Sequence, residues 1–90
     1  MQMNKTLVRT ALTTDQTGRS VQLDYYLLSE YTAGLEQYGT EVVLRRGRED
    51  ERCAVGCITP LASSMTRIIG LLAEATVTPT GLRDVLEDIL

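Results

Sequence analysis

Few side chains of this 90-residue chain can do chemistry, and their spacing restricts them further. The sequence has no histidine, which excludes Ser/His/Asp and Cys/His catalytic pairs and any metal site that needs a histidine ligand. Asp84, Glu87 and Asp88 lie within about one turn of a predicted helix, a spacing compatible with acid and base catalysis. They lie opposite the apolar side of that helix, so we expect them to face water. We predict no catalytic residue, no cofactor and no metal ligand, and we favour a protein that is not an enzyme.

The two cysteines, Cys53 and Cys57, are four residues apart in a predicted strand. Four residues of strand span about 13 Å, beyond the ~7 Å limit on the Cα separation of a disulfide. A Cys-x-x-x-Cys spacing without other ligands does not indicate a zinc site. We therefore expect both thiols to be buried and to pack as small apolar side chains.

The elements that position these residues follow from two hydrophobic periods. Alternation with period two, punctuated by short turns, predicts four strands in an antiparallel meander, over residues 5–13, 20–30, 37–46 and 51–58. At Thr59-Pro60 the period changes. A Thr N-cap followed by Pro predicts a helix over residues 60–75, and Thr78-Pro79 repeats this signal for a helix over residues 79–89.

Strands followed by helices predict an α+β fold, a single domain over residues 1–90 with both helices on one face of the sheet. The alternation leaves an apolar set on the opposite face, which we expect to be an interaction surface: Tyr26, Leu28, Val43, Ala54 and Ile58.

The charge pattern argues against nucleic acid. The net charge is −3, the wrong sign for a protein that neutralises phosphates. A helix-turn-helix would present Arg83 beside three carboxylates, which repel phosphate. A predicted hairpin tip holds Arg45, Arg46, Arg48 and Arg52, but Glu49, Asp50 and Glu51 leave it near neutral. No unbroken apolar run indicates a signal peptide or a membrane span, so we expect a cytoplasmic protein without a membrane partner.

The end of the second predicted helix carries an unfavourable charge distribution. Glu87 and Asp88 lie at the negative end of the helix dipole, where carboxylates cost roughly 0.3–1 kcal/mol each. We expect a basic group to pair with these carboxylates. It is either an arginine of the chain itself or part of a partner.

Several segments together resemble a small bacterial domain family of unknown function, associated with anaerobic Gram-positive bacteria. They are Tyr26, Tyr38-Gly39-Thr40-Glu41-Val42, Val77-Thr78-Pro79, Leu82, Asp84-Val85 and Glu87-Asp88. The resemblance covers most of the chain and implies a cytoplasmic bacterial protein. It carries over no activity, cofactor or site residue.

Two functional hypotheses follow. The preferred one is a non-enzymatic protein-interaction or regulatory module that binds a protein partner or forms a homodimer. It would use the outer sheet face, the acidic helix with Asp84, Glu87 and Asp88, or both. The alternative is a small-ligand-binding protein or enzyme with a pocket between sheet and helices, near Tyr38 and Cys57.

Overall fold

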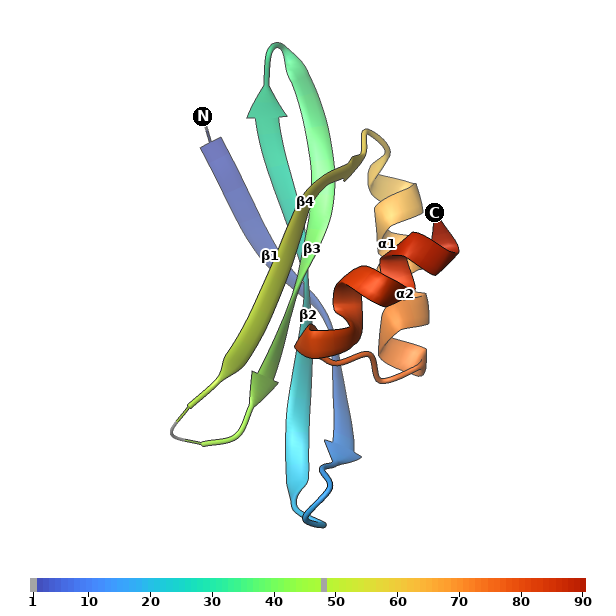
Figure 1. Ribbon diagram of the computed structural model, residues 1–90. Coiled ribbons are helices and arrows are strands. Elements are labelled where there is room, and N and C mark those ends of the chain that lie inside the picture. Colours follow the sequence, from blue (N-terminus) through green and yellow to red (C-terminus); the bar gives the residue numbers. More distant parts are fainter. Residues whose placement is uncertain (1, 48) are drawn as a thin grey trace.

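Four antiparallel strands and two helices build the molecule, as a computed structural model describes it for residues 2–47 and 49–90. The strands follow one another in the sheet in the order β1-β2-β3-β4, and the helices lie against one face of it (Figure 1). The elements are β1 (Gln2–Thr14), β2 (Ser20–Thr32), β3 (Leu35–Arg45), β4 (Glu51–Thr59), α1 (Ala62–Glu74), the 3-10 turn η1 (Pro79–Gly81) and α2 (Leu82–Ile89). The predicted α+β fold and meander are confirmed. Arg48, part of the predicted basic tip, lies outside the described residues.

Tight turns hold the first three strands in register. The Asp15 carboxylate accepts hydrogen bonds from the backbone N–H groups of Thr17 and Arg19, at 2.9 and 3.0 Å, and so closes the β1–β2 turn. Ala33 and Gly34 both have positive φ angles, 52° and 80°, as a two-residue type I′ hairpin turn requires. Because this turn matches the twist of its strands, pairing continues to Thr32 and Leu35, beyond the predicted strand ends.

The core lies between the sheet and the helices. Leu23 and Tyr25 of β2 and Val42 of β3 are fully buried on the inner face, and α1 covers them with its own buried residues, Met65, Ile68, Ile69, Leu72 and Ala73. The Tyr25 hydroxyl donates a 2.9 Å hydrogen bond to the carbonyl of Val77, in the segment between the helices. Burial raises the pKa of this hydroxyl to about 12. One strand is thereby tied to the helical layer through both apolar and polar contacts.

A bulge near the end of β4 overturns two predictions. Val55 pairs with Thr40, but Thr59 pairs with Tyr38, so β4 contains two extra residues in this stretch. Cys57 takes a positive φ of 52° and is exposed, where a buried thiol was predicted. Ile58 turns to the helix side and packs against the core, where the outer face was predicted. The local crowding requires a glycine at position 39, because a Cβ there would collide with the Val55 carbonyl oxygen.

The two Thr-Pro pairs behave differently. Thr59 is the last residue of β4, and α1 begins at Ala62, two residues after the predicted start. The Thr59 hydroxyl accepts a 3.2 Å hydrogen bond from the N–H of Leu61, so it stabilises the approach to the helix without capping it. The second helical segment begins at Pro79, as predicted, but as the 3-10 turn η1 that leads directly into α2, and the Thr78 side chain makes no capping hydrogen bond. No helix of the described residues is long and apolar enough to cross a membrane.

Candidate functional site

The outer face of the sheet, turned away from the helices, is less apolar than predicted. Tyr26, Leu28 and Val43 lie on this face, but Leu28 is only 4% exposed and Val43 only 1%. Leu28 lies opposite Lys5 of β1 in the sheet. Val43 lies opposite Asp24 of β2 on one side and opposite Arg52 of β4 on the other. Longer polar side chains therefore surround the two apolar residues.

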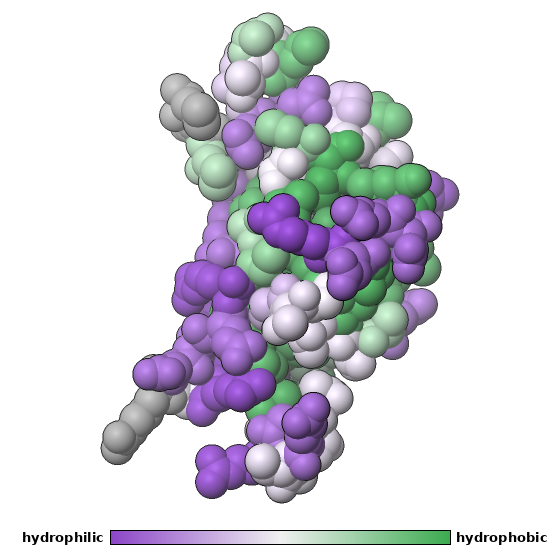
Figure 2. All heavy atoms as spheres, in the orientation of Figure 1, coloured by the Kyte–Doolittle hydropathy of each residue, from purple (hydrophilic) through white to green (hydrophobic). Residues whose placement is uncertain are grey.

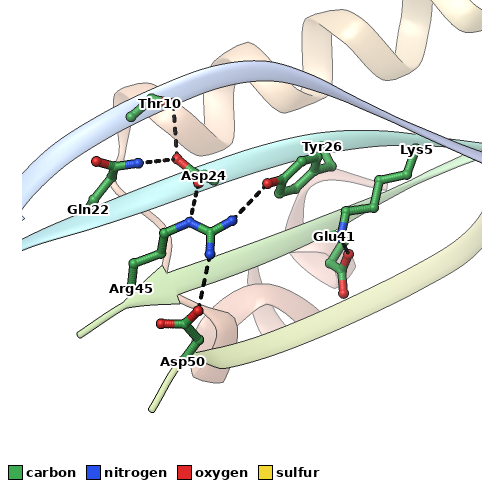
Figure 3. Close-up of polar contacts among 8 residues, drawn as sticks. All are labelled: Lys5, Thr10, Gln22, Asp24, Tyr26, Glu41, Arg45 and Asp50. Carbon is green, nitrogen blue, oxygen red and sulfur yellow. Dashed lines mark hydrogen bonds and ion pairs between the residues drawn. The ribbon is translucent and has the colours of Figure 1, made fainter. Parts of the chain in front are cut away.

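Arg45 is the centre of a polar network on the outer face (Figure 3). Its guanidinium donates to Asp24 Oδ2 at 2.6 Å, to Asp50 Oδ2 at 3.1 Å and to the Tyr26 hydroxyl at 2.9 Å. The second oxygen of Asp24 accepts hydrogen bonds from Thr10 and Gln22. The network thus joins β1, β2, β3 and Asp50, the residue that immediately precedes β4.

The network keeps Asp24 ionised although the residue is 3% exposed. Burial alone would raise the pKa of this carboxyl, but hydrogen bonds from Arg45, Gln22 and Thr10 and the charge of Arg45 outweigh burial. The pKa of Asp24 is therefore held below its usual value of 3.8. The hydrogen bonds to Asp24 and Tyr26 in turn raise the pKa of Arg45. A carboxylate fixed in its charged form by a cation has no free proton to exchange near neutral pH.

A second polar group covers the neighbouring part of the outer face. Lys5 forms a 2.7 Å ion pair with Glu41, and its ammonium lies 4.3 Å from the centre of the Tyr26 ring (Figure 3). Among the described residues, every buried side-chain nitrogen or oxygen has a hydrogen-bond partner. The outer face around Tyr26, Leu28 and Val43 is thus covered by polar side chains that satisfy one another. Along β1, three apolar residues in register with outer-face residues of β2 stay 55%, 51% and 75% exposed: Met3, Leu7 and Leu12.

The helix side carries an apolar hollow, which we name the α1/α2 groove. It has a volume of about 460 Å³ and lies where the end of β4 meets α1 and the C-terminal end of α2. Its lining is mostly apolar: Ile58, Thr59, Ser64, Arg67, Ile68, Leu71, Ile89 and Leu90. Leu71 is 47% exposed and Ile89 39%, and Leu61 is exposed just before α1. Hydrophobic side chains here lie beside a hydrophilic cluster in the helical layer (Figure 2).

The predicted acidic residues lie on the helix that forms one wall of this groove. Asp84, Glu87 and Asp88 are exposed on α2, and Glu87 and Asp88 immediately precede the two lining residues of that helix. Within residues 2–47 and 49–90, no lysine or arginine forms an ion pair with any of the three. The arginines of the described chain therefore do not neutralise these three carboxylates through ion pairs.

The other candidates from the sequence do not form a site together. Cys53 is half-buried and Cys57 exposed, both as free thiols, and neither Tyr38 nor Cys57 lines the α1/α2 groove. No group of three carboxylate or thiol residues in the described chain is placed to hold a metal ion.

A larger hollow of about 960 Å³ separates the tips of the β1–β2 and β3–β4 hairpins. Arginines and carboxylates alternate along its walls: Asp15, Arg19, Arg45, Arg46 and Glu49. Two arginines of the β3–β4 tip have local partners: Arg45 pairs with Asp50 and Arg46 with Glu51. This hollow has charges of both signs along its walls and so no single charge with which to select a ligand.

The α1/α2 groove was not predicted from the sequence, because its lining depends on the positions of Leu71, Arg67 and Ile58. Leu71 falls outside the helical stripe that packs on the sheet, so an extra leucine on α1 was the available signal. Ile58 reaches the groove only because of the β4 bulge, which strict alternation does not predict.

The chain belongs to the DUF6514 family, a family of unknown function, and the match covers residues 4–90. No curated protein and no solved structure matches the chain.

Proposed function

We propose that this DUF6514 chain is a non-enzymatic protein-interaction module and that its docking surface is the α1/α2 groove. The observation that carries the proposal is the exposure of Leu71 and Ile89 together in one apolar hollow. A small monomer gains free energy by covering such side chains, so a concave apolar patch is a typical protein-binding surface.

The rest of the molecule supports this choice of surface. The centre of the outer sheet face, which the sequence indicated, holds Leu28 and Val43 under ion pairs and hydrogen bonds. A partner that docked there would have to displace the Asp24–Arg45 pair and would leave a charge unpaired, a cost of several kcal/mol. No such cost applies at the groove, where the exposed lining is mainly leucine and isoleucine.

Site-specific photocrosslinking in cells that naturally make the protein tests the proposal. A photoreactive amino acid replaces Leu71 in one variant and, in another, Leu12 of β1, a leucine that is more exposed still, 75% against 47%. We expect a discrete adduct from position 71 that disappears when Ile89→Asp is added, and none from position 12. An adduct with twice the mass of the chain would identify a homodimer. Absence of any adduct at position 71, or an adduct that survives Ile89→Asp, would count against the module.

A second candidate function rests on the same hollow. The α1/α2 groove lies between the sheet and the helices, and its volume falls within the range of about 300–1,000 Å³ of small-molecule sites. Arg67 in its lining fits a ligand with an apolar body and an anionic end. A thermal-shift screen of medium-chain carboxylates tests this function. A stabilisation that Arg67→Gln abolishes would favour it over the interaction module.

We also propose a cytoplasmic setting in a bacterial cell. The two unpaired cysteines support a reducing compartment. Localisation of a tagged chain by cell fractionation tests this, and recovery from the extracellular fraction would exclude it.

A further inference from the structure

We propose that the occupant of the α1/α2 groove is a short amphipathic helix of a partner protein, with apolar side chains in the groove and lysines or arginines toward α2. This inference rests on the proposed function and adds the chemistry of the partner.

The shape of the groove favours a helix over an extended strand. Its walls are α1 and the end of α2, and the edge strand β4, along which strand addition would take place, reaches the groove only with its last two residues, Ile58 and Thr59. An amphipathic helix places apolar side chains at i, i+3, i+4 and i+7 on one side, and two or three of these match a hollow of about 460 Å³. Leu71 and Ile89 would lose most of their remaining exposure against such a helix.

The charge beside the groove selects a basic partner. Glu87 lies one helical turn before Leu90 and so on the side of this lining residue, whereas Asp88 precedes Ile89 in the chain without facing the same side; neither carboxylate is part of the lining itself. They also lie at the negative end of the α2 dipole, which adds to their potential. Because no described arginine or lysine pairs with them, a cation on the partner meets uncompensated negative charge.

The same charges disfavour a second copy of the chain. A symmetric dimer through the groove would bring two acidic α2 ends together, in a protein whose net charge is already −3. Arg67, across the groove on α1, is the cation of the lining. It is placed to receive the negative, C-terminal end of the docked helix and so to set its direction.

A designed peptide tests this chemistry without a known partner. The probe is a fluorescent helical peptide of about 16 residues with leucines at i, i+3, i+4 and i+7 and lysines on the flanks. A matched peptide carries glutamates in place of the lysines. Fluorescence anisotropy with the full chain measures both affinities. We expect saturable binding of the lysine peptide and binding at least about tenfold weaker for the glutamate peptide, the effect of a few exposed charge pairs.

Two variants of the protein separate the apolar and charged contributions. Leu71→Asp adds a negative charge that by itself would attract the lysine peptide, so a loss of about tenfold or more shows that leucine packing is required. Glu87→Gln with Asp88→Asn should weaken binding by about two- to fivefold for each charge and flatten its salt dependence. Leu12→Asp is the control, at a leucine of β1 that is even more exposed than Leu71, and should leave the affinity unchanged.

The outcomes distinguish a wrong assignment of the partner from a wrong assignment of the docking surface. In one outcome, the lysine and glutamate peptides bind equally well and both lose affinity in Leu71→Asp. This result would overturn the proposal of a basic partner, while the groove would remain a docking surface. A concentration-dependent dimer that Leu71→Asp dissociates would also overturn the basic partner in favour of a second copy. Binding of the lysine peptide that Leu71→Asp leaves intact would show attraction by general charge alone and would overturn both. Circular dichroism of each variant confirms that it is folded.

Discussion

The centre of the outer sheet face and the α1/α2 groove both carry apolar side chains that the helices leave outside the central core, but only the centre of the outer face supplies polar groups that close over them. Leu28 and Val43 lie among Lys5, Glu41 and Arg45, whose ion pairs bridge neighbouring strands. In the groove, Leu71 and Ile89 have Arg67 and Ser64 as polar neighbours in the lining, and they stay partly exposed.

The difference shows that an apolar residue on a second face is not by itself an interaction surface. On a flat sheet, long charged side chains one pair away can lie over a leucine or valine while their charged ends stay in water. At a junction between two helices and a strand end, the backbone diverges and short neighbours cannot span the gap. The concave junction therefore retains the exposed apolar area that a partner can bury.

The largest expected effect comes from adjacent leucines of α1. Leu72 is fully buried in the core, whereas Leu71 is 47% exposed in the groove. We expect Leu72→Ala to lower the free energy of unfolding by about 2–5 kcal/mol, because it leaves a cavity. Leu71→Ala should change it by no more than about 0.5 kcal/mol. Urea denaturation of both variants measures this, and equal losses would contradict the assignment of Leu71 to a free surface.

The next effect concerns the outer face. Asp24→Ala removes the acceptor of three hydrogen bonds, two of them at a single oxygen, and should cost about 1.5–3 kcal/mol of unfolding free energy. Glu41→Ala, which breaks the more exposed pair with Lys5, is the matched control and should cost about 0.2–1 kcal/mol. A larger loss for Glu41→Ala would show that the Arg45 network does not close this face.

The lowered pKa of Asp24 gives the same region a pH dependence. A carboxyl whose pKa is lower in the folded than in the unfolded chain stabilises the fold above the unfolded value, near 3.8. This contribution is lost as the pH falls through the folded pKa. Between about pH 5 and pH 2, the unfolding free energy of the native chain should therefore fall more steeply than that of Asp24→Asn. Parallel curves from denaturation at each pH would contradict the role of Asp24.

The smallest effect has the opposite sign and lies beside the groove. Asp88→Asn removes a carboxylate from the negative end of α2 and should raise the free energy of unfolding by about 0.3–1 kcal/mol. The same substitution should weaken the binding of the lysine peptide. Thermal unfolding and anisotropy measure the two quantities. A destabilised Asp88→Asn would show that the carboxylate already has a basic partner within the chain.

The sequence predicted the fold well because its patterns are local. Alternation with period two predicted the four strands of the meander, and Thr78-Pro79 predicted the start of the second helical segment. The β4 bulge was not predictable from alternation, because Cys57 and Ile58 continue the alternating pattern while the backbone inserts two residues.

The candidate site was harder to predict for a related reason. The sequence placed Tyr26, Leu28 and Val43 on the outer face, but their cover depends on which charged side chains of other strands lie beside them. That pairing follows from the sheet register. Asp84, Glu87 and Asp88 were visible as exposed acids. Their position beside Leu71 and Ile58 depends on how α2 crosses the rest of the fold.

The central claim is that the α1/α2 groove, and not the outer sheet face, is where this chain binds. Chemical-shift mapping on isotope-labelled protein, with the lysine-flanked peptide added in steps, tests it most directly. The account predicts that the largest shifts fall on the amides of Arg67, Leu71 and Ile89, with those of Asp24 and Arg45 unchanged. Shifts centred on Asp24, Tyr26 and Arg45, with the groove unaffected, would contradict it.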